Sequence, residues 1–97
     1  MHVTIEIVVP ASHTNELIDD LEQLDEVISL TAIREGSIKP PGAVLTVHTL
    51  NRGADKVMQL ADTMREHGQV SITTYELTSI VDPEHHDEVF NDVDEAL

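Results

Sequence analysis

Strict alternation of apolar and polar residues opens the chain and most constrains its fold. Val3, Ile5, Ile7 and Val9 fall on one side of an extended backbone, and polar residues occupy most positions between them. A period of two with β-branched residues is typical of a strand with one buried face. Pro10 ends this strand, because proline cannot donate to a sheet. The chain must therefore supply further elements to cover that face.

An amphipathic helix is predicted directly after Pro10. The hydroxyl of Ser12 or of Thr14 can cap its first turn by accepting a backbone hydrogen bond. The apolar residues recur at helical spacing, and acidic residues cover the rest of the surface. This apolar stripe consists of Leu17, Ile18, Leu21 and Leu24.

Alternating segments predict three more strands, with a second amphipathic helix before the last of them. The strands are expected over Val27–Arg34, Ala43–Leu50 and Val70–Ile80. In the first of these, Ile28, Leu30 and Ala32 share one face; in the second, Leu45 and Val47 point inward.

Turn and cap residues mark the remaining boundaries. Gly36–Gly42 is the main loop, and Pro41 followed by Gly42 suits the centre of a type II turn. Asn51 can cap the second helix, and Gly68 can end it in the left-handed conformation. Gly53 falls in the first turn of that helix, where glycine costs stability, so it can mark close packing.

The order of elements is therefore β-α-β-β-α-β over residues 1–81, which predicts a ferredoxin-like α+β sandwich of the ACT-like kind. In that topology the first and third strands are central, and the other two lie at the edges. The fourth strand is rich in Thr and Ser. Such an exposed edge can pair with a second copy, which predicts a homo-oligomer.

The last segment, 82–97, differs in kind, because acidic residues dominate it. It predicts an acidic helical tail that leads toward a missing C-terminal part. Asp82, His85, His86 and Glu88 are candidate metal ligands. His85 and His86 diverge by about 100° on a helix, so only pairs such as Asp82 with His86 share a face. The alternative interpretation is a solvated acidic helix without a metal.

A second candidate site follows from the predicted topology. The turn after the first strand, the loop between the second and third strands and the end of the second helix meet at one end of the sheet. A helix N-terminus with nearby cations favours carboxylates or phosphates. The candidate ligand-binding residues are Ser12, His13, Arg34 and Lys39, and Arg65 or His67 could join them. Alternatively, Arg34 and Lys39 neutralise nearby carboxylates.

Composition excludes several classes of function. The 97 residues include 19 acidic and 5 basic side chains, a formal charge of −14. Nucleic acids and anionic lipids both require a basic surface, so neither is an expected partner. The absence of cysteine excludes disulfides and thiolate metal sites. No nucleophile motif or glycine-rich phosphate loop is present, so we expect neither an enzyme nor a cofactor.

Four segments carry a family resemblance: Ile38–Gly42, Leu50–Asp55, Glu76–His85 and Asn91–Ala96. Together they resemble the N-terminal soluble part of a family of hydrophobic, multi-pass bacterial membrane proteins of unknown function. The resemblance extends from about Ile28 onward and is most specific from Ser79 to Ala96. It implies a domain at the cytoplasmic face of the membrane, attached to a membrane domain, and it implies no catalytic activity.

The sequence therefore predicts a non-catalytic regulatory or assembly domain of a membrane protein that self-associates through an edge strand. The alternative is a sensing domain. It would bind a small anion at the start of the first helix, or a divalent cation on the acidic tail.

Overall fold

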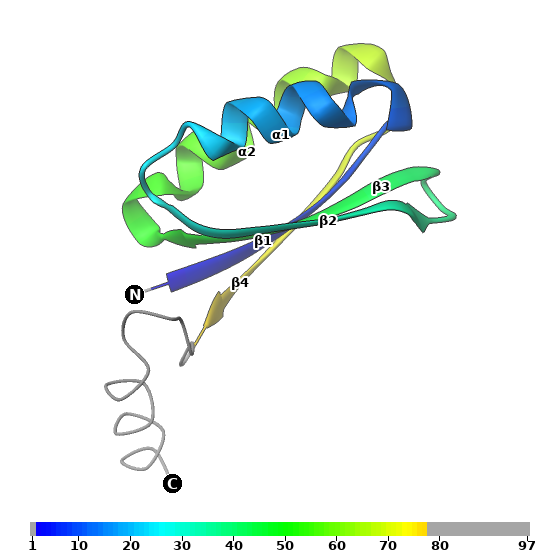
Figure 1. Ribbon diagram of the computed structural model, residues 1–97. Helices are drawn as coiled ribbons and strands as arrows, with labels where there is room; N and C mark the ends of the chain where they lie inside the picture. Colours follow the sequence, from blue (N-terminus) through cyan, green and yellow to red (C-terminus); the bar gives the residue numbers. More distant parts are fainter. Residues whose placement is uncertain (1, 78–97) are drawn as a thin grey trace, which may run out of the picture.

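The computed structural model describes residues 2–77, which form a four-stranded antiparallel sheet with two helices on one of its faces (Figure 1). Strands β1 (His2–Val9), β2 (Val27–Ser37), β3 (Gly42–Leu50) and β4 (Ser71–Leu77) form the sheet. Helix α1 (Thr14–Glu22) follows β1, and helix α2 (Ala54–Thr63) follows β3. The predicted α+β class is confirmed at this level, whereas the predicted tail 82–97 lies outside the described residues.

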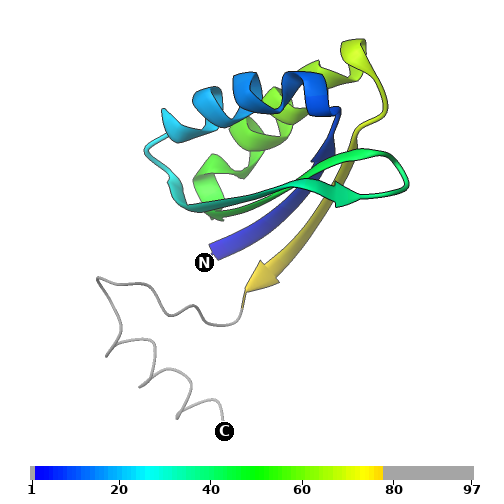
Figure 2. The ribbon, with the colours of Figure 1, turned by 45° about the vertical axis from the view of Figure 1, so that its right-hand side comes forward.

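The strand order is β2-β3-β1-β4, so β1 and β3 are central and β2 and β4 are the edges. Figure 2 shows α1 and α2 side by side above the sheet, with nothing of residues 2–77 below it. The four core-facing residues of β1 alternate as expected and are all at most 8% exposed. Leu45 and Val47 of β3 are fully buried, as predicted.

The core lies between the helices and this face of the sheet. From the helices, Leu17 and Leu21 of α1 and Val57 and Ala61 of α2 are fully buried. Burying one such large apolar side chain contributes about 1.5–3 kcal/mol. The apolar stripe that the sequence places on the first helix therefore fixes which side of α1 meets the sheet.

Strand β2 departs from the simple alternation that its sequence suggests. Its pairing with β3 shifts between Val27 and Ser29, and again between Ile33 and Ser37. Leu30 packs against the core, but Ile28 is 36% exposed and Ala32 is also exposed. The prediction that Ile28, Leu30 and Ala32 share one face is therefore wrong for Ile28, which the first shift displaces. Leu30 and Ala32 do share a face, since they pair with Val47 and Leu45, but the core does not extend over Ala32.

Short 3₁₀ segments replace the predicted helix caps. Segments η1 (Ala11–His13) and η2 (Asn51–Gly53) precede α1 and α2, and η3 (Met64–His67) follows α2. Neither helix has a side-chain cap: the N-cap residues are His13 and Gly53. The predicted caps at Ser12 or Thr14 and at Asn51 are therefore wrong, because the extra turns carry the chain from strand to helix.

Two predicted turn details also differ. β2 continues to Ser37, so the connection to β3 spans only residues 38–41, and Gly42 already belongs to β3 with φ +152°. Gly68 has φ +155° and ψ −163°, which is not the left-handed helical cap expected from the sequence.

The side of the sheet that residues 2–77 leave uncovered is called the open face below. Three rows of cross-strand neighbours run across it, in the order β2, β3, β1, β4. The rows are Ile33–Val44–Val8–Ser71, Thr31–Thr46–Glu6–Thr73 and Ser29–His48–Thr4–Tyr75.

Candidate metal centre

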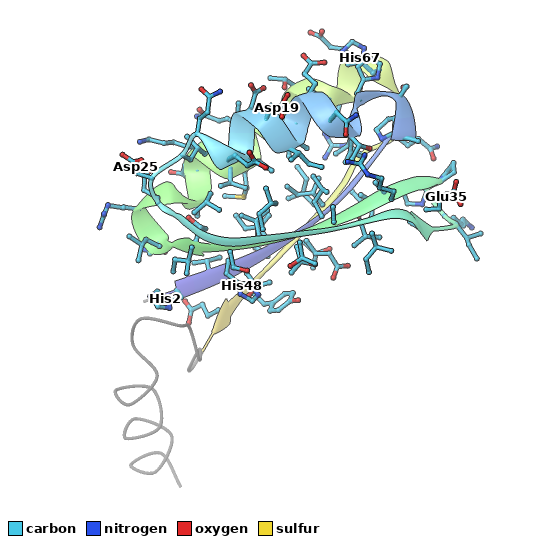
Figure 3. All side chains as sticks on the ribbon, in the orientation of Figure 1. His2, Asp19, Asp25, Glu35, His48 and His67 are labelled. Carbon is cyan, nitrogen blue, oxygen red and sulfur yellow. The ribbon has the colours of Figure 1, made fainter. Side chains whose placement is uncertain are left out.

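Two histidines from distant parts of the chain meet at one end of the helical layer. His13 ends η1, just before α1, and His67 ends η3, just after α2. Their ring centroids are 3.7 Å apart and the ring planes differ by 7°, so the imidazoles are stacked. Figure 3 labels His67 at this end of the molecule, beyond Asp19 of α1. Imidazole nitrogens are the commonest metal ligands in proteins, so this pair defines a candidate site.

Local hydrogen bonds hold the η1 side of the site. The His13 amide donates to the carbonyl oxygen of Pro10 at 3.0 Å, and the Thr14 hydroxyl donates to the same oxygen at 3.2 Å. Pro10 ends β1, so these two bonds place His13 a fixed short distance beyond a central strand. Thr14 is 2% exposed, so this anchor is shielded from water.

The η3 side is held by Arg65. Its Nε donates to the Asp62 carboxylate at 2.6 Å, and its Nη1 donates to the carbonyl oxygen of Val70 at 2.8 Å. Asp62 belongs to α2 and Val70 immediately precedes β4, so Arg65 ties the helix end to the start of an edge strand. His67 lies between these anchors.

Glu16 completes a group of three ligands. It stands in the first turn of α1, three residues after His13, so both side chains lie on the same side of this turn. One ligand atom from each of His13, Glu16 and His67 lies within 4.8 Å of the other two. Two imidazole nitrogens and one carboxylate oxygen form a known zinc ligand set, which leaves a fourth position for water or another group.

Ser12 supports His13 from the side. Its Oγ lies 2.8 Å from Nδ1 of His13. When the proton is on Nδ1, the ring donates to Ser12 and the lone pair of Nε2 is free for a metal ion. Ring nitrogens that bind metals usually have such an outer partner, which fixes the tautomer and the ring orientation.

The stacked rings of His13 and His67 do not point their lone pairs at a common ion. The lone pairs of an imidazole lie in the plane of its ring, so two parallel rings point their lone pairs in parallel planes rather than at one point. A metal ion that bound both rings would turn at least one of them out of the stack. His13 is half-buried, whereas Glu16 and His67 are exposed, so His67 has the greater freedom to turn.

The predicted ligand-binding residues are only partly brought together. Ser12 and His13 form a hydrogen bond and share the site with His67. Arg34 lies in β2 and Lys39 in the β2–β3 connection, and both are exposed. Within residues 2–77 the ion pairs are Lys56–Glu26 and Arg65–Asp62, so neither Arg34 nor Lys39 takes part in one.

Two observations at this end count against an anion. Arg65, a candidate cation, is engaged by Asp62 and Val70. Glu16 puts a negative charge in the first turn of α1, where an anion would sit. The cluster therefore suits a cation better. The other predicted metal ligands, Asp82, His85, His86 and Glu88, lie outside the described residues.

Glu16 is not among the metal ligands predicted from the sequence. The spacing of His13 and Glu16 is a readable signal, because residues three apart on a helix are neighbours. His67 as the partner of His13 has no such local signal. Only the antiparallel placement of α1 and α2 over the sheet brings η1 next to η3 (Figure 1).

The other end of the helical layer carries the perturbed carboxyl group. Figure 3 labels Asp25 there, far from His67. The Glu26 carboxylate accepts a hydrogen bond from Lys56 at 3.0 Å. This bond lowers the pKa of Glu26 below its ordinary value of 4.5, with smaller contributions from a backbone hydrogen bond and from the charges of Lys56 and Arg52.

A groove of about 500 Å³ runs between α2 and the edge strand β4. Asp55 and Glu76 lie along it, so its charge opposes the binding of anions. Its remaining lining residues are Val3, Asn51, Ala54, Met58, Thr74 and Tyr75. Among residues 2–77, no helix has both the length and the apolar composition to span a membrane.

Of the comparisons with known proteins, the one with solved structures found proteins of similar fold. No protein-family model matches the chain, and no curated protein is similar to it in sequence. A crystal structure of a DUF3240 family protein from Shewanella baltica OS155 superimposes with a TM-score of 0.65 at 12% identity. The superposition covers 81% of this chain and 92% of the other.

A second solved structure is that of a candidate antibiotic biosynthesis monooxygenase from Deinococcus radiodurans. It superimposes with a TM-score of 0.51 at 21% identity, over 84% of this chain and 97% of the other. At these identities the two likenesses establish a shared ferredoxin-like fold and carry no activity to this chain.

Proposed function

We propose that this chain is a non-catalytic regulatory domain that binds a divalent transition-metal ion through His13, Glu16 and His67. The observation that supports this most strongly is that one ligand atom of each residue lies within 4.8 Å of the other two. The contacts of Arg65 and Glu16 favour a cation over an anion at this end. The tail site is a separate hypothesis, since its residues lie outside residues 2–77.

The donor atoms favour a particular class of ion. Calcium and magnesium prefer oxygen ligands, whereas imidazole nitrogen suits zinc, copper, nickel and iron. Two of the three donors here are imidazoles, so the proposed ion belongs to the second group. Zinc is the natural probe, because it has no redox chemistry and accepts a tetrahedral site with one open position.

The positions of the ligands support a regulatory role. His13 belongs to the β1–α1 connection and His67 to the segment between α2 and β4, so an ion would join two connections that the backbone leaves separate. Binding to the folded state alone stabilises it, by about 2.7 kcal/mol when the ion is at a hundred times its dissociation constant. The proposed readout is therefore the position and stability of the β4 edge.

The non-catalytic part of the proposal rests on exposure. Glu16 and His67 are exposed, so water reaches the site freely, whereas catalytic metal sites are usually dry and shaped cavities. The name of the Deinococcus protein favours a catalytic role as a second candidate. The groove beside β4 could hold an organic molecule of ordinary size, since ligand pockets span about 300–1,000 Å³.

The cellular setting is also a proposal. The resemblance to the N-terminal part of multi-pass bacterial membrane proteins supports a place at the cytoplasmic face of a membrane, next to an attached membrane domain. Self-association through an edge strand is supported by β4, whose pairing with β1 runs from His2–Leu77 to Val8–Ser71 without a shift. Such a regular edge has no bulge to block pairing.

Isothermal titration calorimetry of the full chain with zinc chloride tests the metal site. We expect one ion per chain, and at least tenfold weaker binding for His13→Ala and for His67→Ala. Ser12→Ala should weaken binding about 10–100-fold, as expected for an outer partner of a metal-bound histidine. Ser12→Thr keeps the hydroxyl and should bind zinc like the unmodified chain. Binding should weaken at low pH, because protons compete for the imidazoles.

Two control variants separate this site from other histidines. His48→Ala removes a histidine from the open face and should leave zinc binding unchanged. A variant with both His85→Ala and His86→Ala tests the tail site directly. If the tail variant abolishes binding and His67→Ala does not affect it, the proposal is wrong.

A further inference from the structure

The open face is almost free of charge in a strongly acidic protein. Glu6 is the single acidic residue in its three rows, although the chain has 19 acidic residues. Figure 3 shows the contrast: Asp19 and Asp25 are labelled on the side of the helices, and His48 on the side of the open face. Depletion of charged residues is what distinguishes the centre of a protein interface from other surfaces.

The open face also has an apolar row. Ile33, Val44 and Val8 are cross-strand neighbours on three adjacent strands, and Val8 is only 9% exposed. The Ile33 side chain is 60% exposed, and Tyr75, two rows away on β4, is 47% exposed. Threonines and His48 occupy most of the remaining positions, and of these Thr4 is buried, at 2% exposed. The accessible surface therefore combines apolar side chains with neutral hydrogen-bonding groups. Both kinds of group are common at interface centres.

Charge indicates which partner this face fits. Two copies of a chain with a formal charge of −14 repel each other, and contact through the helices would bring carboxylates together. Exposed charges interact over a Debye length of about 8 Å at physiological ionic strength. The open face is the described surface that presents the fewest like charges to a second copy. A basic partner would instead be attracted to the acidic helical side.

We propose that the open face packs against the open face of a second copy, which gives a two-fold symmetric dimer. A self-complementary contact of this kind needs one patch that matches itself, and a patch with an apolar row along one side and Glu6 as its one acidic residue meets that condition. The inference goes beyond the metal site, because none of His13, Glu16 and His67 lies on this face. It competes with the edge pairing described under the proposed function, which uses backbone groups of β4 or β2, and the test below separates the two.

Sedimentation velocity and light scattering over a concentration series test the proposal. We expect the unmodified chain to form dimers at physiological salt, and Thr46→Glu to weaken the dimer at least tenfold. Thr46 lies on β3, which is flanked by β2 and β1, so it has no free edge through which two copies could pair. Thr63→Glu makes the same change on α2, where we expect no effect.

A second matched pair guards against a folding defect. Ile33→Glu adds a charge to the apolar row at a side chain that is already 60% exposed, so the monomer should fold. Ile38→Glu makes the same change in the β2–β3 connection, outside the rows, at a side chain that is 93% exposed. Circular dichroism at low concentration checks that each variant retains its secondary structure.

The outcomes separate the face from the edge. Loss of the dimer in both Thr46→Glu and Ile33→Glu, with both controls unchanged, supports packing through the open face. A dimer that survives Thr46→Glu points to edge pairing and overturns the proposal. A chain that stays monomeric at millimolar concentration overturns it as well.

Discussion

Glu26 accepts hydrogen bonds from three residues and so links several elements of the fold. Its carbonyl oxygen accepts hydrogen bonds from the Leu50 amide at 2.9 Å and from the Thr49 hydroxyl at 3.0 Å. Its carboxylate accepts from Lys56. Three elements, β3, α2 and the start of β2, are therefore joined at one residue, at the end of the molecule opposite the histidines.

The Lys56–Glu26 pair predicts a pH dependence of stability. Because Lys56 lowers the pKa of Glu26 in the folded state, the ionised pair stabilises the fold above the ordinary value of 4.5. That contribution is lost as the pH falls through the lowered value. We expect Lys56→Met to reduce the free energy of unfolding in urea at pH 7, and the difference from the unmodified chain to shrink toward pH 3. A difference that is constant with pH would contradict this.

At the scale of elements, the connections between strands and helices determine where each helix begins and how β2 pairs with β3. Both helices begin through 3₁₀ turns without side-chain caps, and β2 shifts register twice against β3. Gly53 explains why the second connection has its shape. A Cβ at this position would collide with the Cβ of Glu26 and lie 2.7 Å from the Thr49 hydroxyl. The close packing that its place in the sequence suggested is present.

Gly53→Ala should therefore destabilise the fold by about 1–3 kcal/mol, the usual cost of forcing extra volume into a packed region. The obstacles are the base of the Glu26 side chain and a buried threonine, and neither can move away cheaply. Gly36→Ala is the matched control. Its new Cβ would lie 2.9 Å from a methyl group of the exposed Ile33 and 3.1 Å from the Ile33 Cβ and a methyl group of Val44. These contacts are longer than those at Gly53, so we expect a smaller cost. Thermal unfolding measures both, and equal costs would contradict the explanation.

Charge dominates at the level of the whole molecule. Acidic side chains outnumber basic ones by 19 to 5, and residues 2–77 contain two ion pairs. Exposed pairs contribute little, so most of the repulsion is not offset. Among residues 2–77 most carboxylates belong to the helices and the connections next to them, whereas the three rows of the open face contain Glu6 alone. The fold therefore separates a surface that repels copies of itself from one that can accept a copy.

This repulsion predicts that salt stabilises the fold. Raising sodium chloride from low to physiological concentration shortens the Debye length to about 8 Å and screens the carboxylates from one another. We expect the thermal unfolding midpoint to rise across this range. The variant His67→Ala serves as a control for zinc, because its midpoint should respond to salt but not to added zinc. A midpoint that does not change with salt would contradict the expectation.

The sequence by itself determined where strands and helices form, because periodicity is a local property. The alternation through Val9, the stop at Pro10 and the apolar stripe of α1 could all be read directly. The boundaries and caps of the helices could not be predicted from the sequence, because the 3₁₀ turns at η1 and η2 depend on how the strands meet the helices. The shift in β2 also left no clear signal in its sequence.

Only the tertiary structure decided which side chains act together. Ser12 and His13 could be named as candidates from their place after the first strand, and the predicted topology allowed Arg65 or His67 to join them without pairing either with His13. Their partner His67 lies far along the chain, and packing of α1 beside α2 brings the two imidazoles to 3.7 Å. The neutrality of the open face is likewise invisible in a linear sequence, because it depends on which four strands lie side by side and which of their faces the helices leave bare.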